Sequence, residues 1–142
     1  MEHITKTYLS VRYAETDRMG IMHHSRYYPW FEVARGDFIK QFGGSYRELE
    51  ESGILMPLTE THSKYIQGLK YDEEAVILCK LAELSVAKCK FEYEVYRISD
   101  NKLVNTGYTK HGFVDESFRP VNLKKKNPKV WELLENLVYS EE

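Results

Sequence analysis

The stretch that decides the fold runs from Val11 to Phe42 and reads VRYAETDRMGIMHHSRYYPWFEVARGDFIKQF. It opens on a strand-like alternation that passes through Val11 and Tyr13. From about Ser25 to Phe42, apolar side chains recur at helical spacing. These side chains are Tyr27, Phe31, Ala34, Phe38 and Phe42, with Trp30 widening the stripe. The segment between strand and helix, which carries Asp17, is therefore predicted to be a loop held by two rigid elements, a common place for catalytic groups.

The remaining elements follow from the same patterns. Residues 4–13 alternate as a strand, and Gly43-Gly44 is predicted to end the long helix. A capping-box pattern, Ser45 with Glu48, indicates a short helix to about Ser52. Four β-rich runs follow, at residues 54–66, 75–85, 88–98 and 103–114, with a hairpin turn at 99–102. A last helix is expected from Asn127 as N-cap and Pro128 as first residue, after a solvated connector at 124–126.

This order predicts an α+β domain in which one long apolar helix packs on an antiparallel five-stranded sheet, followed by a C-terminal helix. With 142 residues and no repeat, low-complexity segment or linker, the whole of residues 1–142 is expected to be one domain.

Charge and composition exclude several classes of function. Twenty basic against 22 acidic residues leave a formal net charge of −2, so no nucleic-acid partner is expected. The two cysteines, Cys79 and Cys89, lack metal-ligand spacing and are expected to be reduced thiols of a cytoplasmic protein. The first residues, MEHITKT, lack the apolar core of a signal peptide, and no apolar run is long enough to span a bilayer, so no membrane insertion is expected.

The loop carries groups suited to reaction at a carbonyl. Asp17 can serve as a general base or as a nucleophile, and a purely structural turn role is the alternative. Gly20 lets the backbone turn and approach a ligand. The amides of His23, His24 and Ser25 are expected at the start of the helix, where the helix dipole favours a developing negative charge. An ordinary helix start is the alternative reading.

Two other kinds of site are weaker fits to the same residues. A metal site of Asp17, His23 and His24 would need further clustered ligands and a better spacing than adjacent histidines. A triad of Ser25, His24 and Asp17 lacks a nucleophile elbow. We therefore expect neither a metal nor a redox cofactor.

The pattern T-D-x-x-G-I-x-x-H-x-x-Y resembles the signature of the 4-hydroxybenzoyl-CoA thioesterase family, hotdog-fold hydrolases of acyl-coenzyme A (CoA) thioesters. It is formed here by Thr16, Asp17, Gly20, Ile21, His24 and Tyr27. The resemblance extends more weakly over residues 5–122 and includes Tyr71-Asp72 and residues 113–115. Tyr13 matches a tyrosine of the acyl-CoA thioesterase branch. Arg26 and Gly68 depart from the family pattern, standing where asparagine and proline are common.

The resemblance implies a hotdog domain in which the curved sheet wraps the long central helix, working as a homodimer or homotetramer. It implies hydrolysis of an acyl-CoA thioester, with CoA as part of the substrate rather than a cofactor. Asp17 would be the base or nucleophile, and the His24 backbone amide would hold the oxyanion. Tyr13 would act near Asp17 as a hydroxyl donor or pack as a wall.

Substrate contacts follow from the same resemblance. Gly20 and Tyr27 would lie at the acyl pocket, and Lys88 and Lys90, which share one strand face, would meet the CoA phosphates. A solvated strand face is the alternative for the two lysines. Two other functions remain open on this scaffold: a non-catalytic acyl-CoA sensor, and a hydratase or dehydratase. The latter needs a His-Asp or His-Glu pair for proton transfer at carbon and fits the loop less well.

Overall fold

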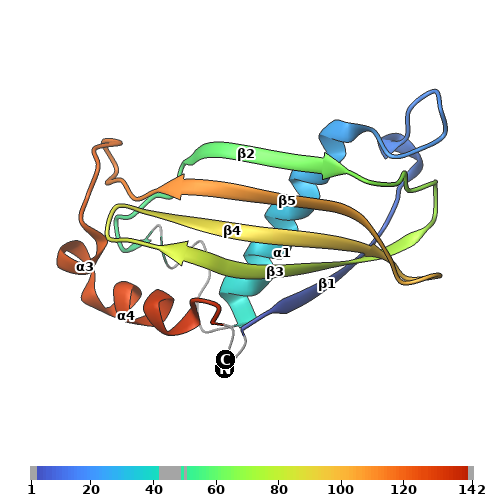
Figure 1. Ribbon diagram of the computed structural model, residues 1–142. Coiled ribbons are helices and arrows are strands. Elements are labelled where there is room, and N and C mark those ends of the chain that lie inside the picture. Colours follow the sequence, from blue (N-terminus) through green and yellow to red (C-terminus); the bar gives the residue numbers. More distant parts are fainter. Residues whose placement is uncertain (1–2, 42–48, 50, 141–142) are drawn as a thin grey trace.

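A five-stranded antiparallel sheet in the order β1-β3-β4-β5-β2 forms one layer of the computed structural model, which describes residues 3–41, 49 and 51–140 (Figure 1). The strands are β1 (Thr5–Ser10), β2 (Leu58–Tyr65), β3 (Glu74–Leu84), β4 (Lys88–Arg97) and β5 (Lys102–Gly112). Helix α1 (Tyr27–Gln41) crosses one face of the sheet. These elements confirm the predicted hotdog arrangement.

Shorter elements surround this pair of layers. Two 3-10 turns, η1 (Tyr13–Glu15) and η2 (His24–Arg26), flank the motif loop. Helices α3 (Leu123–Lys126) and α4 (Pro128–Leu137) follow β5. The side chain of Asn127 accepts a hydrogen bond from the Val130 amide, so the predicted N-cap with Pro128 in the first turn is confirmed. None of the described helices has the length and apolar character needed to cross a membrane.

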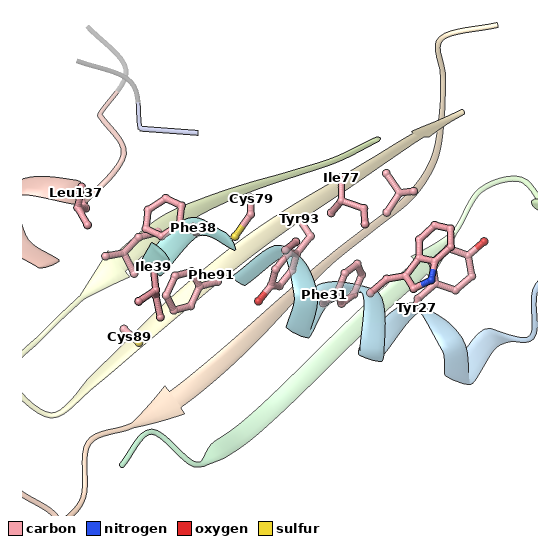
Figure 2. Packing of buried hydrophobic residues seen from close by; sticks show 14 of the residues in the cluster. Tyr27, Phe31, Phe38, Ile39, Ile77, Cys79, Cys89, Phe91, Tyr93 and Leu137 are labelled. Carbon is pink, nitrogen blue, oxygen red and sulfur yellow. The ribbon is translucent and has the colours of Figure 1, made fainter. Parts of the chain in front are cut away.

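The core lies between α1 and the sheet because both present apolar side chains at their natural period (Figure 2). In β4 the inward side chains are Cys89, Phe91, Tyr93 and Val95, all buried. From α1, the rings of Tyr27, Trp30, Phe31 and Phe38 are buried as predicted.

One aromatic stack fixes the middle of α1 on the sheet. The Phe31 ring lies 4.4 Å from the Tyr93 ring, nearly parallel to it. Such pairs contribute about 0.5–1.5 kcal/mol beyond the area they bury. Gly107 makes room for this contact, because a Cβ there would lie 2.6 Å from the Phe31 ring and from the His62 carbonyl oxygen.

A buried polar chain beside this stack was not predicted. An Arg35 N–H donates to the Tyr93 hydroxyl at 3.1 Å, and the Tyr93 and Thr109 hydroxyls are 2.7 Å apart. The His111 ring lies 2.9 Å from the Thr109 hydroxyl through Nε2 and 3.2 Å from the Met56 carbonyl through Nδ1. Burial, with the nearby Arg35 charge, lowers the pKa of His111 to about 4.

Because the His111 ring is neutral, all the hydrogen bonds of this buried polar series run in one direction. The Met56 carbonyl can only accept, so Nδ1 carries the proton and Nε2 accepts from Thr109. The Thr109 hydroxyl then accepts from Tyr93, which accepts from Arg35. The structure therefore accommodates four polar side chains in the core by ordering their hydrogen bonds from Arg35 to Met56.

The structure corrects several predicted boundaries. Strand β1 ends at Ser10 rather than Tyr13, because the chain turns at Arg12 into η1. The long helix begins with the 3-10 turn η2 and becomes α-helical at Tyr27. Residues 124–126 are helical rather than a connector, with Asn122 capping them. The predicted helix stop and capping box, Gly43, Gly44, Ser45 and Glu48, lie outside the described residues, as does Phe42.

Candidate active site

The Asp17 loop is a tight turn closed by backbone hydrogen bonds. The Asp17 amide donates to the Ile21 carbonyl at 2.9 Å, and the Gly20 amide donates to the Asp17 carbonyl at 3.0 Å. Gly20 has a φ of 82°, in the left-handed region that favours glycine. A Cβ on Gly20 would meet no atom within 4 Å. Glycine is therefore required here by backbone conformation rather than by close packing of the protein.

The Asp17 carboxylate has one committed oxygen and one available oxygen. Oδ1 accepts a hydrogen bond of 2.8 Å from the Met19 amide, which is the turn role that the sequence left open. Within the described part of the chain, Oδ2 has no hydrogen-bond partner. The structural role therefore leaves one carboxylate oxygen for chemistry.

The three backbone amides at the start of η2 differ in whether they donate a hydrogen bond. His23 donates to the Glu15 carbonyl at 2.8 Å, and Ser25 donates to the His23 ring nitrogen Nδ1 at 3.2 Å. The His24 amide donates to no acceptor among residues 3–41, 49 and 51–140. Of the three candidate oxyanion donors, His24 is thus the one with an unused N–H.

A cavity of about 240 Å³ lies between this loop, the start of α1 and the end of β2 with the segment that follows it. It is lined by Asp17, Met19, Ile21, Met22, His24, Tyr27, Tyr65, Ile66, Gln67 and Gly68. The structure therefore brings together Asp17, His24 and Tyr27, and it adds a second wall from the end of β2. Figure 1 shows the loop beside the end of β2 and the connection to β3.

Tyr65, which sequence reasoning missed, links the two walls. Its hydroxyl donates to the His24 carbonyl at 3.1 Å, and its ring meets the Tyr27 ring edge to face at 5.5 Å. Burial, with the neighbouring Tyr65, raises the pKa of Tyr27 to about 12, so Tyr27 is a neutral wall residue. Tyr65 ends an exposed edge strand far along the chain, and no local pattern marks it.

Glu15 is the second residue that the sequence did not reveal. Its side chain is 3% exposed, with Oε2 accepting from the Trp30 indole N–H at 3.1 Å and Oε1 from the Arg12 amide at 2.9 Å. The backbone carbonyl of Glu15 accepts a hydrogen bond from the His23 amide. Glu15 therefore fastens the loop to α1 two residues before Asp17. A charged residue in a loop looks solvent-exposed in a sequence, which is why this role was not predicted.

The segment after β2, which forms the opposite wall of the cavity, is hydrogen-bonded to the loop. The Met22 amide donates to the Leu69 carbonyl at 2.7 Å, and Ile21 pairs with Lys70. A Cβ on Gly68 would lie 2.9 Å from Ile21 Cγ2. Position 68, where this sequence has glycine instead of the proline common in the family pattern, is thus a point at which the Ile21 side chain lies close to the Gly68 backbone.

Tyr13 does not join this cavity. It lies in η1 with 78% of its surface exposed, and its ring contacts the Tyr71 ring at 5.8 Å. The physical reason is the turn at Arg12, which directs Tyr13 away from the line of β1 before the Asp17 loop begins.

Lys88 and Lys90 are not brought to the cavity within one chain either. They lie at the start of β4, whereas Arg97, at the end of the same strand, contacts the Gly68 carbonyl at the cavity wall. The Lys90 ammonium is 3.3 Å from Glu83 and 3.5 Å from Glu92.

The alternative catalytic arrangements are not assembled. The Ser25 hydroxyl bonds to the His23 ring at 2.8 Å rather than to His24, so the considered triad does not form. No group of three or more His, Cys, Asp or Glu side chains placed to hold a metal ion occurs in the described ranges.

Comparisons with known proteins identify the family of the chain. Residues 11–133 match the model of the Thioesterase-like superfamily. A Bacillus subtilis protein described as "Putative acyl-CoA thioesterase YneP" is 35% identical, covering 89% of this chain and 91% of that protein. The structure of a DHNA-CoA thioesterase from Staphylococcus aureus is 31% identical with a TM-score of 0.88, covering 94% of this chain and 89% of that one.

A more distant structure shares the fold alone. It is Slr0204, a 1,4-dihydroxy-2-naphthoyl-CoA thioesterase from Synechocystis, at 14% identity and a TM-score of 0.79, covering 91% of this chain and 93% of that one. The family match over most of the chain, together with the hotdog fold, confirms the enzyme class predicted from the motif. This chain belongs to the Thioesterase-like superfamily and is a thioester hydrolase.

Proposed function

We propose that the protein hydrolyses an acyl-CoA thioester, with Asp17 as base or nucleophile and the His24 amide as oxyanion donor. One observation carries the proposal: a single cavity is lined both by Asp17 and by His24, whose carboxylate Oδ2 and backbone N–H, respectively, have no hydrogen-bond partner in the described part of the chain. Preorganised donors of this kind stabilise the charge that develops on a carbonyl oxygen.

In the general-base form, Asp17 takes a proton from water while the water oxygen attacks the thioester carbon. The carbonyl oxygen becomes negative and is held by the His24 N–H. The C–S bond then breaks, and the thiolate of CoA leaves and takes up a proton. In the nucleophilic form, the Asp17 carboxylate attacks the thioester carbon, the C–S bond breaks, and the CoA thiolate leaves and takes up a proton. Water then hydrolyses the resulting mixed anhydride to the free acid and restores Asp17. Both forms end in free acid and CoA.

The Staphylococcus aureus relative makes aromatic acyl groups natural first substrates to test. Purified protein should be assayed for thiol release against short-chain, long-chain and aromatic acyl-CoAs. Turnover of any of these at more than the spontaneous rate is expected. Saturable binding of acyl-CoA without turnover would instead support the sensor reading, since a sensor keeps the pocket without hydrolysis.

We also propose a homodimer or homotetramer. In the described structure, β2 pairs with β5 on one side and carries exposed residues along nearly all its length. Such an edge invites pairing with another strand. Lys88 and Lys90, at the opposite end of β4 from the cavity, would then serve the CoA phosphates of a neighbouring copy. Light scattering that shows only monomer at micromolar concentration would contradict this assembly.

A further inference from the structure

Gln67 is a polar residue in an otherwise largely apolar wall of the cavity. It is the second residue after β2, and its backbone amide donates to the Val104 carbonyl at 3.1 Å, so its backbone is fixed against β5. The same cavity is also lined by the apolar residues Ile66, Ile21 and Met19. The Tyr65 hydroxyl, also in this wall, already donates to His24.

The Arg97 guanidinium fixes the orientation of Gln67. Arg97 ends β4 with a side chain only 14% exposed. It donates to the Gly68 carbonyl at 2.8 Å and to Asp100 at 2.9 Å, and its Nε lies 3.3 Å from Glu73. Held from three sides, the guanidinium is a rigid support rather than a flexible surface charge.

The same guanidinium donates from Nη1 to the Gln67 Oε1 at 3.1 Å. A guanidinium has donors and no acceptor, so the amide oxygen of Gln67 must face Arg97 and its NH2 group must face away. Within the described residues, this NH2 group has no hydrogen-bond partner. The cavity wall thus holds one oriented side-chain donor.

We propose that Gln67 determines acyl specificity by donating a hydrogen bond from Nε2 to an oxygen carried by the acyl group, with Arg97 as its positioning residue. The inference rests on the proposed thioesterase function and adds a chemical feature of the substrate. Gln67 is exposed in the free protein, and a bound acyl group in this cavity would cover it. A site that donates a hydrogen bond discriminates against the analogue without the acceptor, because a donor covered by that analogue is left unpaired.

Matched pairs of substrates test this. The pairs are 3-hydroxyhexanoyl-CoA with hexanoyl-CoA, and 4-hydroxybenzoyl-CoA with benzoyl-CoA, so that the oxygen is near the thioester in one pair and far in the other. The wild-type protein should prefer the oxygen-bearing member of at least one pair by about 3- to 10-fold in kcat/KM, the range expected for one net hydrogen bond.

Two variants separate specificity from folding. Gln67→Glu keeps an oxygen for Arg97 but removes the donor, and Gln67→Leu removes both. Each should abolish the preference by lowering kcat/KM for the oxygen-bearing acyl-CoA more than for its plain partner, because only the oxygen-bearing member loses a hydrogen bond to Nε2. The matched control is Gln41→Leu, the same change at the exposed end of α1, which should retain the preference.

The outcomes distinguish the two proposals. Turnover without any preference in the wild type, or equal losses on both members of a pair in the Gln67 variants, would overturn the specificity role alone. If the wild type hydrolysed no acyl-CoA, the proposed function would fall, and this inference with it.

Discussion

The hydroxyl of Tyr65 donates a hydrogen bond of 3.1 Å to the carbonyl of His24, across a separation of 41 residues. This contact ties the last residue of β2 to the 3-10 turn whose first amide, that of His24, has no acceptor among the described residues. His24 is therefore held through its own carbonyl by Tyr65 and through the preceding His23 amide by Glu15, so the residue that carries the candidate oxyanion donor is fixed on both sides.

Tyr65→Phe should therefore lower kcat several-fold with little change in KM. It removes one hydrogen bond, typically about 1 kcal/mol, from a residue that positions the oxyanion donor. Steady-state kinetics with a saturating acyl-CoA would measure this. Tyr8→Phe, an exposed tyrosine on β1, is the matched control. A rise in KM alone would assign Tyr65 to substrate binding instead.

Asp17→Asn should lower kcat by about 10² to 10⁴-fold, the usual cost of losing a general base. The amide oxygen of asparagine can still accept from the Met19 amide, so the turn is retained and the free energy of unfolding should change by less than about 1 kcal/mol. Thiol-release kinetics and urea unfolding measure the two effects. Near-native turnover by a folded Asp17→Asn protein would end the proposed mechanism and favour the sensor.

Gly20→Ala should lower the free energy of unfolding by about 1–2 kcal/mol, because alanine at a φ of 82° adopts the left-handed conformation at a steric cost. No clash adds to this cost, since the space beside Gly20 is open. Gly112→Ala is the control, with only Thr59 Cγ2 near its Cβ, at 3.8 Å. Equal unfolding free energies for the two variants would show that conformation at Gly20 is not limiting.

Acid should destabilise the fold through His111. Its pKa is lowered to about 4 in the folded state, against 6.5 when unfolded, so the unfolded chain binds more protons between these values. Stability is fully present above pH 6.5 and is lost as the pH falls toward 4, by up to about 3 kcal/mol. Urea unfolding at a series of pH values would show this slope, and His111→Gln should flatten it. An unchanged slope in that variant would assign the acid sensitivity to other groups.

Replacing Lys88 and Lys90 together by glutamine should raise KM for an acyl-CoA and leave hydrolysis of the matching acyl-pantetheine nearly unchanged. Phosphate contacts made equally in the ground and transition states change binding rather than kcat. Glutamine avoids adding negative charge beside Glu83 and Glu92. Lys6→Gln on the exposed part of β1 is the control. Equal losses on both substrates would point to a folding defect.

The sequence by itself determined the layers of this protein. The alternation in β3 and β4 and the helical stripe from Tyr27 to Phe38 are local patterns, and each element buries the face that its own period defines. The motif around Asp17 likewise indicated a loop, a glycine turn and a helix start, because these depend on neighbours in the chain.

The tertiary structure alone decided which distant residues complete the site. Tyr65, Gln67 and Arg97 reach the loop only because β2 and β4 end beside it, and Glu15 is buried only because Trp30 of α1 covers it. It also decided that Tyr13 turns away and that Lys88 lies at the far end of its strand. Such contacts depend on strand order and register, which arise from packing the whole sheet on α1 and leave no periodic trace in the local sequence.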